Sequence, residues 1–312
     1  MPAKSIKAAD KQTILKKLVT EMKKRYGGAI PKQSRSAFET LLFAACLEDT
    51  DYETAENSFS QLLDGFFDLN EIRVSSVGEI QQTLGEIRAA NWKAMRIRES
   101  LQFVFEKHYA FDLEGLKRKT QEQAQKDLAQ IPHQTSFIRN YVLQHALGAH
   151  VIPVDETIRH LLIWLGLADA KTDAEAAAEE LKSGIKKTEA PLLCYLLKLT
   201  AIDPELIEHF EEAATSKEEV DPMTASTRLA ELFKNPKKKR KPVKAAPPAK
   251  PAPAAKPTAT ASKASTATKA VSLKKPKKTA PSRPANAKVA ASANRKVTKK
   301  VPAKKATRNR SK

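Results

Sequence analysis

The residue best placed for chemistry in this sequence is Asp155, which stands at the start of a predicted apolar helix. Behind it, Ile158, Leu161, Leu162 and Leu165 recur at the spacing of one helix face. A carboxylate in that position most often caps the helix, which stabilises the helix by about 1 kcal/mol. The same negative charge can also stabilise positive charge that develops on a bound molecule. The two roles are compatible, and the residue alone leaves both open.

A short turn without glycine precedes Asp155 and separates two more predicted helices. The turn is Ile131-Pro132-His133-Gln134-Thr135, between a helix over 121–129 and one over 136–147 that Gly148 ends. When the backbone N–H groups of such a turn point outward beside a helix N-terminus, they form a cradle for a phosphate. An ordinary connection between helices is the other interpretation, and both remain open.

The rest of the first 233 residues contains further amphipathic helices. Ser36-Ala37-Phe38-Glu39 fits a capping box, and apolar residues then recur at helical spacing as far as Cys46. Additional helices are predicted over 54–63, on either side of a break near 89–91, and over 155–165, 173–182, 190–199 and 204–214. No segment alternates as a strand does. The sequence therefore predicts an all-α body.

Composition argues against several classes of function. The chain has no run of 18 apolar residues that would span a membrane, and we expect no secretory leader in its Lys-rich first 30 residues. Cys46 and Cys194 are the only cysteines, and their apolar helical surroundings predict buried free thiols in a cytosolic protein. The histidines show no metal-ligand spacing, so we expect neither a metal nor a cofactor. Trp92 and Trp164 are interpreted as core residues.

The end of the chain differs sharply from the body in charge. From Lys234 to Lys312 it carries 26 Lys and Arg and no Asp, Glu, aromatic residue or glycine. Residues 1–233 hold the other 29 basic residues and all 36 acidic ones, so the body is formally −7 and the tail +26. Frequent prolines and scarce large apolar residues predict a disordered tail. Basic clusters such as Lys237-Lys238-Lys239-Arg240 bind polyphosphate by releasing counterions, without reading sequence; a spacer tail is the other interpretation.

Several stretches of the body together resemble the helix–hairpin–helix DNA glycosylases, the family of endonuclease III. Ile131-Pro132 stands where that family's hairpin has its leading Leu-Pro, and Ile152-Pro153-Val154-Asp155 matches the aspartate motif that follows. Upstream, Phe38-Glu39-Thr40-Leu41-Leu42 is similar to the family's first barrel helix, Thr50-Asp51 to the pair that closes it, and Asn91-Trp92-Lys93-Ala94 to its N-x-K-A turn. The resemblance covers about residues 10–205. The Lys/Ala/Pro repeats of the tail resemble a linker-histone tail, which implies nonspecific coating of DNA.

The resemblance implies a protein that acts on DNA, with Asp155 as its catalytic carboxylate. Excising a base requires an extruded nucleotide, and the carboxylate stabilises the oxocarbenium-like transition state while it helps to position a water. The residues then expected at a DNA phosphate are His133, Gln134, Thr135 and Ser136. The family usually has glycine at the places of His133 and Thr135. Either the hairpin keeps its shape at some strain, with side chains adding donors, or it grips phosphate poorly.

The chain differs from the family pattern in three further places, and these differences restrict the reaction that the resemblance implies. Bifunctional members of the family carry a lysine where this chain has Phe137, so the implied reaction is hydrolysis without an imine intermediate. Cys194 alone cannot ligate the four-cysteine iron–sulfur cluster of the family. Glu48 stands where the family often has a glutamine that fills the gap left by the extruded base, and a carboxylate suits that place poorly.

The sequence thus predicts a DNA N-glycosylase of base excision repair without lyase activity, with a helical body over 1–233 and a basic tail over 234–312. It is expected to act as a monomer on double-stranded DNA in the cytoplasm, associated with the nucleoid or chromatin. One alternative is a non-catalytic DNA-binding or nucleoid-organising protein that kept the fold; another is an unrelated helical interaction domain tethered by the tail. Because asparagine also caps helices, Asp155→Asn is expected to abolish excision and leave folding nearly intact.

Overall fold

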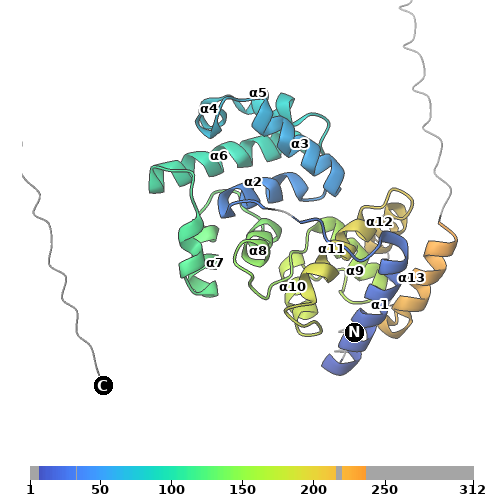
Figure 1. The fold of residues 1–312 in the computed structure, drawn as a ribbon. Helices are drawn as coiled ribbons and strands as arrows, with labels where there is room; N and C mark the ends of the chain where they lie inside the picture. The colour runs from blue at the N-terminus through green and yellow to red at the C-terminus, as the bar shows by residue number, and fades with distance from the viewer. Residues whose placement is uncertain (1–6, 33, 216–219, 237–312) are drawn as a thin grey trace, which may run out of the picture. The chain divides into compact units, whose positions relative to one another are not determined.

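The computed structural model describes residues 7–32, 34–215 and 220–236, and within these ranges the chain forms helices and no strand (Figure 1). The prediction of an all-α body is confirmed. The cluster Lys237-Lys238-Lys239-Arg240 and the rest of the predicted tail beyond it lie outside the described residues. In the described ranges, no helix combines the length and the apolar composition that a membrane crossing requires.

Two hydrophobic cores organise the body, and the first belongs to one continuous stretch of chain. This first lobe contains α2 (Ala37–Leu47), α3 (Tyr52–Asp64), α4 (Leu69–Val74), α5 (Val77–Leu84), α6 (Ala90–His108), the 3₁₀ helix η1 (Glu114–Arg118), α7 (Gln121–Ala129) and α8 (Ser136–His145). Every residue of α2 except Glu39 is buried. A helix that is apolar all round must be enclosed by others, and α3, α6 and α8 pack against it.

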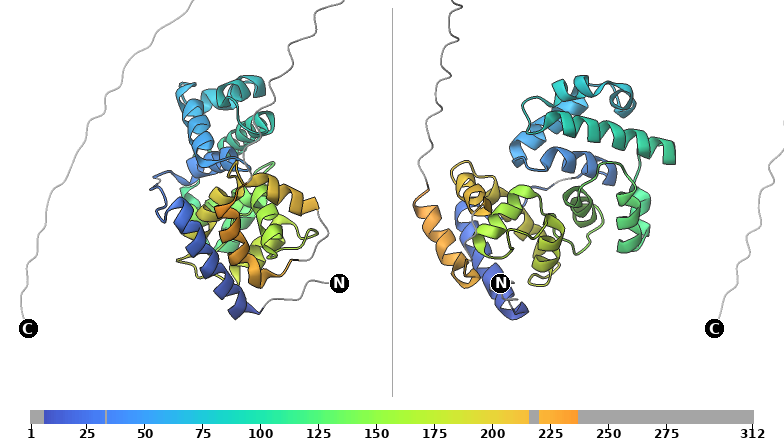
Figure 2. Two further views of the ribbon diagram at one scale, coloured as in Figure 1. Left: turned by 90° about the vertical axis from the view of Figure 1, so that its right-hand side faces the viewer. Right: turned by 180° about the vertical axis from the view of Figure 1, so that it is seen from behind.

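The second lobe joins the N-terminal helix to the later ones. It contains α1 (Ala8–Tyr26), α9 (Glu156–Leu165), α10 (Ala174–Lys182), α11 (Ala190–Ala201), α12 (Ile207–Thr215), η2 (Pro222–Thr224) and α13 (Ala225–Lys234). Ile14, Leu15, Leu18 and Met22 of α1 are buried in its core. Helix α1 packs against α11 and α13, and blue α1 lies beside orange α13 in every view (Figures 1 and 2). The first helix of the chain thus completes a core whose other helices all follow residue 155.

The chain passes between the two cores at two points. One crossing lies between the end of α1 and the start of α2. The other falls between Val151, whose side chain belongs to the first core, and Ile152, whose side chain belongs to the second. Two side chains of α8 hold this crossing: Gln144 Nε2 donates to the Val151 carbonyl at 2.7 Å, and Asn140 Nδ2 to the Ile152 carbonyl at 3.3 Å. The predicted aspartate therefore lies directly beyond a boundary between lobes.

Most of the predicted helices are confirmed, as are the predicted N-caps Ser36 and Asp155, whereas α8 ends at His145, before the predicted stop at Gly148. Ser36 and Glu39 form both hydrogen bonds of the capping box at α2, and α7 covers the predicted residues. Cys46 and Cys194 are free and buried, as predicted. Helices α4 and α13 were not predicted from the sequence. Helix α13 ends at Lys234, so helical structure continues well past the predicted last helix and reaches the predicted boundary between body and tail.

Lys93 of the N-x-K-A motif fixes the loop between α2 and α3. Its buried ammonium group donates to the carbonyls of Cys46 at 2.7 Å and Glu48 at 2.5 Å, and to the hydroxyl of Thr50 at 3.0 Å. The last carbonyls of a helix have no partner within the helix, so Lys93 supplies donors that α2 lacks. Burial lowers the pKa of Lys93 to about 8.

We predict that Lys93→Met destabilises the body by roughly 2–5 kcal/mol at pH 7, because three buried oxygens lose their donor. The deficit should grow between pH 8 and about 10.4, the ordinary pKa of lysine. In that window the unfolded chain still binds a proton that the folded wild type has released, so the wild type gains stability as the pH rises and the variant does not.

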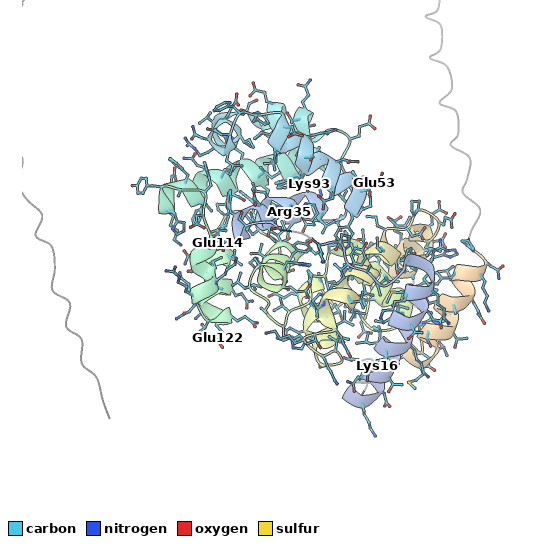
Figure 3. The ribbon with its side chains drawn as sticks, viewed as in Figure 1. Lys16, Arg35, Glu53, Lys93, Glu114 and Glu122 are labelled. Carbon is cyan, nitrogen blue, oxygen red and sulfur yellow. The ribbon has the colours of Figure 1, made fainter. Side chains whose placement is uncertain are left out.

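Urea unfolding of both proteins from pH 7 to 10 measures the difference. Lys16→Met is the matched control, because Lys16 is an exposed lysine on α1, at the far end of the body from Lys93 (Figure 3). A deficit that stays constant or shrinks above pH 8 would contradict the assignment.

Candidate functional site

Asp155 is the N-cap of α9, as predicted, and its carboxylate is closed off from solvent. Oδ1 accepts hydrogen bonds from the backbone N–H of Ile158 and the hydroxyl of Thr157, both at 2.9 Å. Oδ2 accepts from the backbone N–H of Asp49 at 3.0 Å and from the ammonium group of Lys198. Asp155 is only 3% exposed. Each carboxylate oxygen therefore has two donors, and one of the four bonds caps the helix.

Lys198 is the site residue that the sequence analysis missed. It lies on α11, is 2% exposed and forms an ion pair with Asp155. Two opposite charges are tolerated in an apolar interior only as a pair, because either charge alone would be buried without compensation. The sequence does carry a signal, since Lys198 is the one charged residue in α11. A lone lysine in an apolar helix indicates a buried acidic partner, but the sequence does not show which acidic residue that is.

The ion pair fixes the protonation state of Asp155. Burial of the carboxyl opposes ionisation, but the charge and hydrogen bond of Lys198, together with the N–H groups of Ile158 and Asp49, hold its pKa below the ordinary value. The neighbouring Asp49 is affected in the opposite direction, since its own burial and the charge of Asp155 raise its pKa. Asp49 also has a left-handed backbone, with φ of 51°, and accepts a bond from the Thr157 N–H at 3.2 Å. One firmly ionised carboxylate therefore lies where α9 meets the α2–α3 loop.

The hairpin before α8 is strained at His133. Its φ of 59° lies in the left-handed region, which costs a residue with a side chain more than it costs glycine. The turn therefore carries backbone strain at His133, and whether it grips a phosphate stays a prediction. The His133 side chain is exposed, and its Nε2 lies 3.2 Å from a carboxylate oxygen of Glu99.

The other predicted hairpin residues serve the turn itself. The Gln134 side chain donates to the Ser100 hydroxyl at 2.8 Å and to the Pro132 carbonyl at 3.2 Å. Thr135 is the N-cap of α8, and Ser136 is the first residue of that helix. The role of these side chains at a DNA phosphate stays a prediction.

Glu48 ends α2 and is held by an ion pair with Arg96 of α6. Its side chain is 14% exposed, so its predicted place in the gap left by an extruded base would require release from Arg96. Trp92 lies one helical turn before Arg96 and is therefore on the same side of α6. It is 60% exposed, so its interpretation as a core residue was wrong. Trp164 does pack against the second core.

Phe137 is buried, as expected of an apolar anchor at the start of α8. Its ring lies 5.5 Å from the Lys198 nitrogen and 5.9 Å from the ring of Tyr141. Phe137 of α8 therefore adjoins the buried ion pair through Lys198 of α11.

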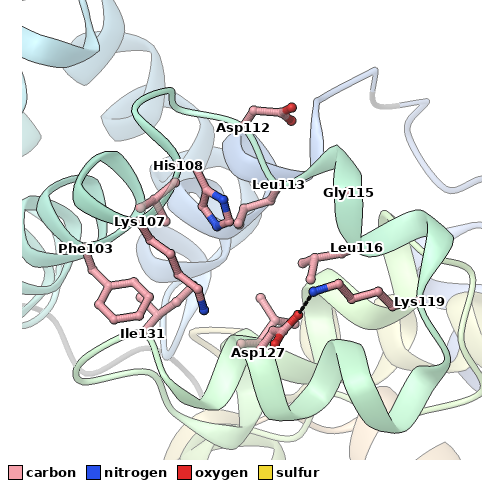
Figure 4. Close-up of a pocket in the computed structure, with 12 residues that line it drawn as sticks. Phe103, Lys107, His108, Asp112, Leu113, Gly115, Leu116, Lys119, Asp127 and Ile131 are labelled. Carbon is pink, nitrogen blue, oxygen red and sulfur yellow. Dashed lines mark hydrogen bonds and ion pairs between the residues drawn. The ribbon is translucent and has the colours of Figure 1, made fainter.

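An apolar cavity of about 100 Å³ lies between the end of α6, η1 and α7 (Figure 4). Its polar residues include Lys107, His108 and the ion pair of Lys119 with Asp127. Ile131 at the start of the hairpin lines it, but no residue that is bonded to Asp155 does. Among the described residues, no three His, Cys, Asp or Glu side chains gather in a way that could hold a metal ion.

We predict that Asp155→Asn destabilises the body by about 3–5 kcal/mol, because it leaves the Lys198 ammonium buried without a counter-charge. This corrects the expectation from sequence that the variant folds almost normally, which considered the helix cap alone. The double variant Asp155→Asn/Lys198→Met keeps the cap and removes both charges, so it should recover most of the loss. Urea unfolding of the wild type, Asp155→Asn, Lys198→Met and the double variant completes a mutant cycle. An Asp155→Asn variant as stable as the wild type would contradict the prediction.

No family model and no curated protein sequence matches the chain. Solved structures are similar to it. A trapped covalent intermediate of endonuclease III with DNA is 16% identical, and the match covers 60% of this chain and 84% of that chain at a TM-score of 0.48. The 3-methyladenine DNA glycosylase of H. pylori bound to 1,N6-ethenoadenine is 18% identical, with coverage of 72% and 97% and a TM-score of 0.43.

An 8-oxoguanine glycosylase/lyase of Clostridium acetobutylicum in complex with DNA is 10% identical, with coverage of 60% and 69% and a TM-score of 0.48. These likenesses concern the course of the backbone, and the chemistry of the site depends on the side chains described above.

Proposed function

We propose that the protein binds double-stranded DNA and excises a damaged base, with Asp155 as the group that stabilises the reacting sugar. The observation that carries this proposal is the ionised carboxylate at the N-terminus of α9, directly beyond the boundary between the lobes. A charge held in a setting of low dielectric acts more strongly on a neighbouring charge than one in water. A carboxylate kept in this state suits a reaction that passes through a cation.

The proposed reaction is hydrolysis of the bond between the base and C1′ of its sugar. The base leaves with the bonding electron pair and takes up a proton, while positive charge develops on the sugar ring. Water then adds to C1′ and loses a proton, which leaves an abasic site. Asp155 contributes the negative charge that faces the ring and an acceptor that orients the water.

The ion pair sets a condition on this chemistry. While Lys198 is bonded to Asp155, the pair has no net charge and both carboxylate oxygens are occupied. Excision therefore requires that bound DNA separates Lys198 from Asp155 or draws the Asp49 loop away from it. The first change would act inside the second lobe, and the second at the contact between the lobes.

The same pair supports a second candidate function, a DNA-binding or nucleoid-organising protein that does not excise bases. The full set of bonds on Asp155, and the ion pair that holds Glu48, are what a site retained for stability alone would show. The two candidates differ in one measurable respect, which is whether any base is released from a duplex that the protein binds.

We predict that the full-length protein releases a base from at least one member of a panel of lesion-bearing duplexes and leaves the abasic strand intact. Phe137 offers no amine, and an ammonium paired with Asp155 is not a nucleophile. Borohydride trapping should therefore give no covalent adduct with a chain that ends at Pro236. Binding without any release would favour the second candidate.

Two controls show which lysine is responsible for any covalent adduct in the trapping experiment. The chain that ends at Pro236 is needed because exposed tail lysines can attack a pre-made abasic site without any active site. Lys198→Met is needed because Lys198 is the lysine that is hydrogen-bonded to Asp155. An adduct that forms with the shortened chain and disappears in Lys198→Met would overturn the assignment as a simple hydrolase.

We further propose that the basic tail supplies most of the nonspecific affinity for DNA, in a monomer associated with nucleoid or chromatin. The body, with its formal charge of −7, is repelled by a duplex at long range, whereas the tail carries +26. Removal of residues 237–312 should weaken binding to undamaged duplex and flatten its salt dependence, since each lost phosphate contact lowers the slope by about 0.9. Equal affinity and an equal slope for both chains, in anisotropy titrations from low to high salt, would refute this division.

A further inference from the structure

A second cavity of about 100 Å³ is lined by residues of α2, α3, α8 and α11 and of the segment before α2. The residues that line it come from four separate segments: Ile30, Pro31, Arg35, Thr40, Tyr52, Tyr141, His145 and Tyr195. Four of these side chains are tyrosine or histidine rings. Such a concentration of flat, partly polar rings around one cavity is typical of a site for a planar ligand.

The cavity adjoins the ion pair on two helices. Tyr195 precedes Lys198 by about one turn of α11 and therefore shares its side of the helix. On α8, Tyr141 is one turn beyond Phe137, whose ring contacts both Lys198 and Tyr141. The pKa of Tyr52 is raised well above its ordinary value by burial and by neighbours that include Tyr141, Tyr195 and Asp155. The cavity is thus linked to the ion pair through the rings of Tyr141 and Phe137, although no residue that is bonded to Asp155 lines it.

The rings form the walls of the cavity. Tyr52 and Tyr195 have centroids 5.0 Å apart at 49°, and Tyr141 stacks on His145 at 4.0 Å and 25°. His145 is exposed and Tyr141 is buried, so this stacked pair leads inward from the surface. Because the walls are rings, they favour a flat ligand over a branched one.

Arg35 supplies the charge of the cavity and an unused donor. Its guanidinium lies over the ring of Phe43 at 3.9 Å and is ion-paired with Glu56 through Nη2. Nη1 is buried and has no hydrogen-bond partner among the described residues. A buried donor without an acceptor is unfavourable, and a ligand with a carbonyl oxygen would satisfy it. Glu56 offsets the charge of Arg35 but does not line the cavity, so a cationic ligand there would face the guanidinium directly and no carboxylate.

We propose that this cavity receives the extruded base, and that Arg35 makes it select uncharged bases with a carbonyl oxygen over cationic, ring-alkylated ones. The inference rests on the proposed function, because it presupposes an extruded base beside Asp155. Selection among lesions then follows from one guanidinium: it donates to the oxygen of an oxidised or deaminated base and repels an alkylated purine. Undamaged bases also carry carbonyl oxygens, but extrusion from a sound pair costs more than from a damaged one.

The test compares the affinity of the full-length protein for duplexes that differ at one base. Hypoxanthine is uncharged and has a carbonyl, 1,N6-ethenoadenine is uncharged and has none, and 7-methylguanine is cationic. Competition with unlabelled undamaged duplex removes the contribution of the tail. Hypoxanthine should bind about tenfold more tightly than ethenoadenine, the usual effect of a hydrogen bond to a charged group, and 7-methylguanine should bind no better than undamaged duplex.

Variants assign the preference to Arg35. The double variant Arg35→Met/Glu56→Gln removes the guanidinium without leaving a lone carboxylate, and should bring the three duplexes within about twofold of one another. Arg73→Met is the matched control, because Arg73 also lies over a phenylalanine ring, that of Phe105 at 4.6 Å, and does not line the cavity. Circular dichroism and the unfolding midpoint confirm that both variants fold.

The outcomes separate this inference from the function on which it rests. A preference for 7-methylguanine, or a hypoxanthine preference that survives in Arg35→Met/Glu56→Gln, overturns the role of Arg35. Binding of all duplexes with equal affinity overturns the role of the cavity and leaves DNA binding in place. Failure to bind any duplex overturns the proposed function and the cavity's role together.

Discussion

The buried ion pair of Asp155 and Lys198 is the interaction on which the centre of this protein depends. It joins the start of α9 to α11 inside the second lobe, and through the Asp49 N–H it also reaches the α2–α3 loop of the first lobe. Lys93 holds the same loop from the other side. The loop is thus fixed between two buried lysines, one acting on its carbonyls directly and the other through a shared carboxylate. Loss of either charge of the pair would expose an uncompensated charge to an apolar interior.

The bonds that make this centre stable also limit its reactivity. A carboxylate stabilises a cation best when its charge is free, and Lys198 neutralises that charge in the protein alone. Lys198 nevertheless keeps Asp155 ionised in a place where burial would otherwise favour its neutral form. The ion pair with Lys198 therefore keeps Asp155 ionised and at the same time neutralises its charge. An enzyme and a binding protein with the same body would differ in whether bound DNA separates Lys198 from Asp155.

The sequence correctly predicted features that depend on neighbouring residues, such as helix caps. It did not predict contacts between residues that are far apart in the chain. The cap at Asp155, the capping box at Ser36 and the bounds of α7 follow from neighbouring residues and were correct. The partners of Asp155 and Glu48 come from α11 and α6, and a single sequence gives no pairing between helices. Trp92 was placed wrongly because burial depends on which side of α6 faces α2, and an aromatic residue fits either side. Helix α4 was missed because six residues with one buried side chain give too little periodicity.

The place of α1 has a consequence for the order in which the chain can fold during its synthesis. The first lobe is continuous and is complete once Val151 has left the ribosome. Helix α1 is made before it, but its packing partners α11 and α13 are among the last helices to appear. Its apolar side, formed by Ile14, Leu15 and neighbours, must wait uncovered while the first lobe collapses around α2. The apolar side of α1 can therefore be covered only after α11 and α13 have been synthesised, when almost the whole body has been made.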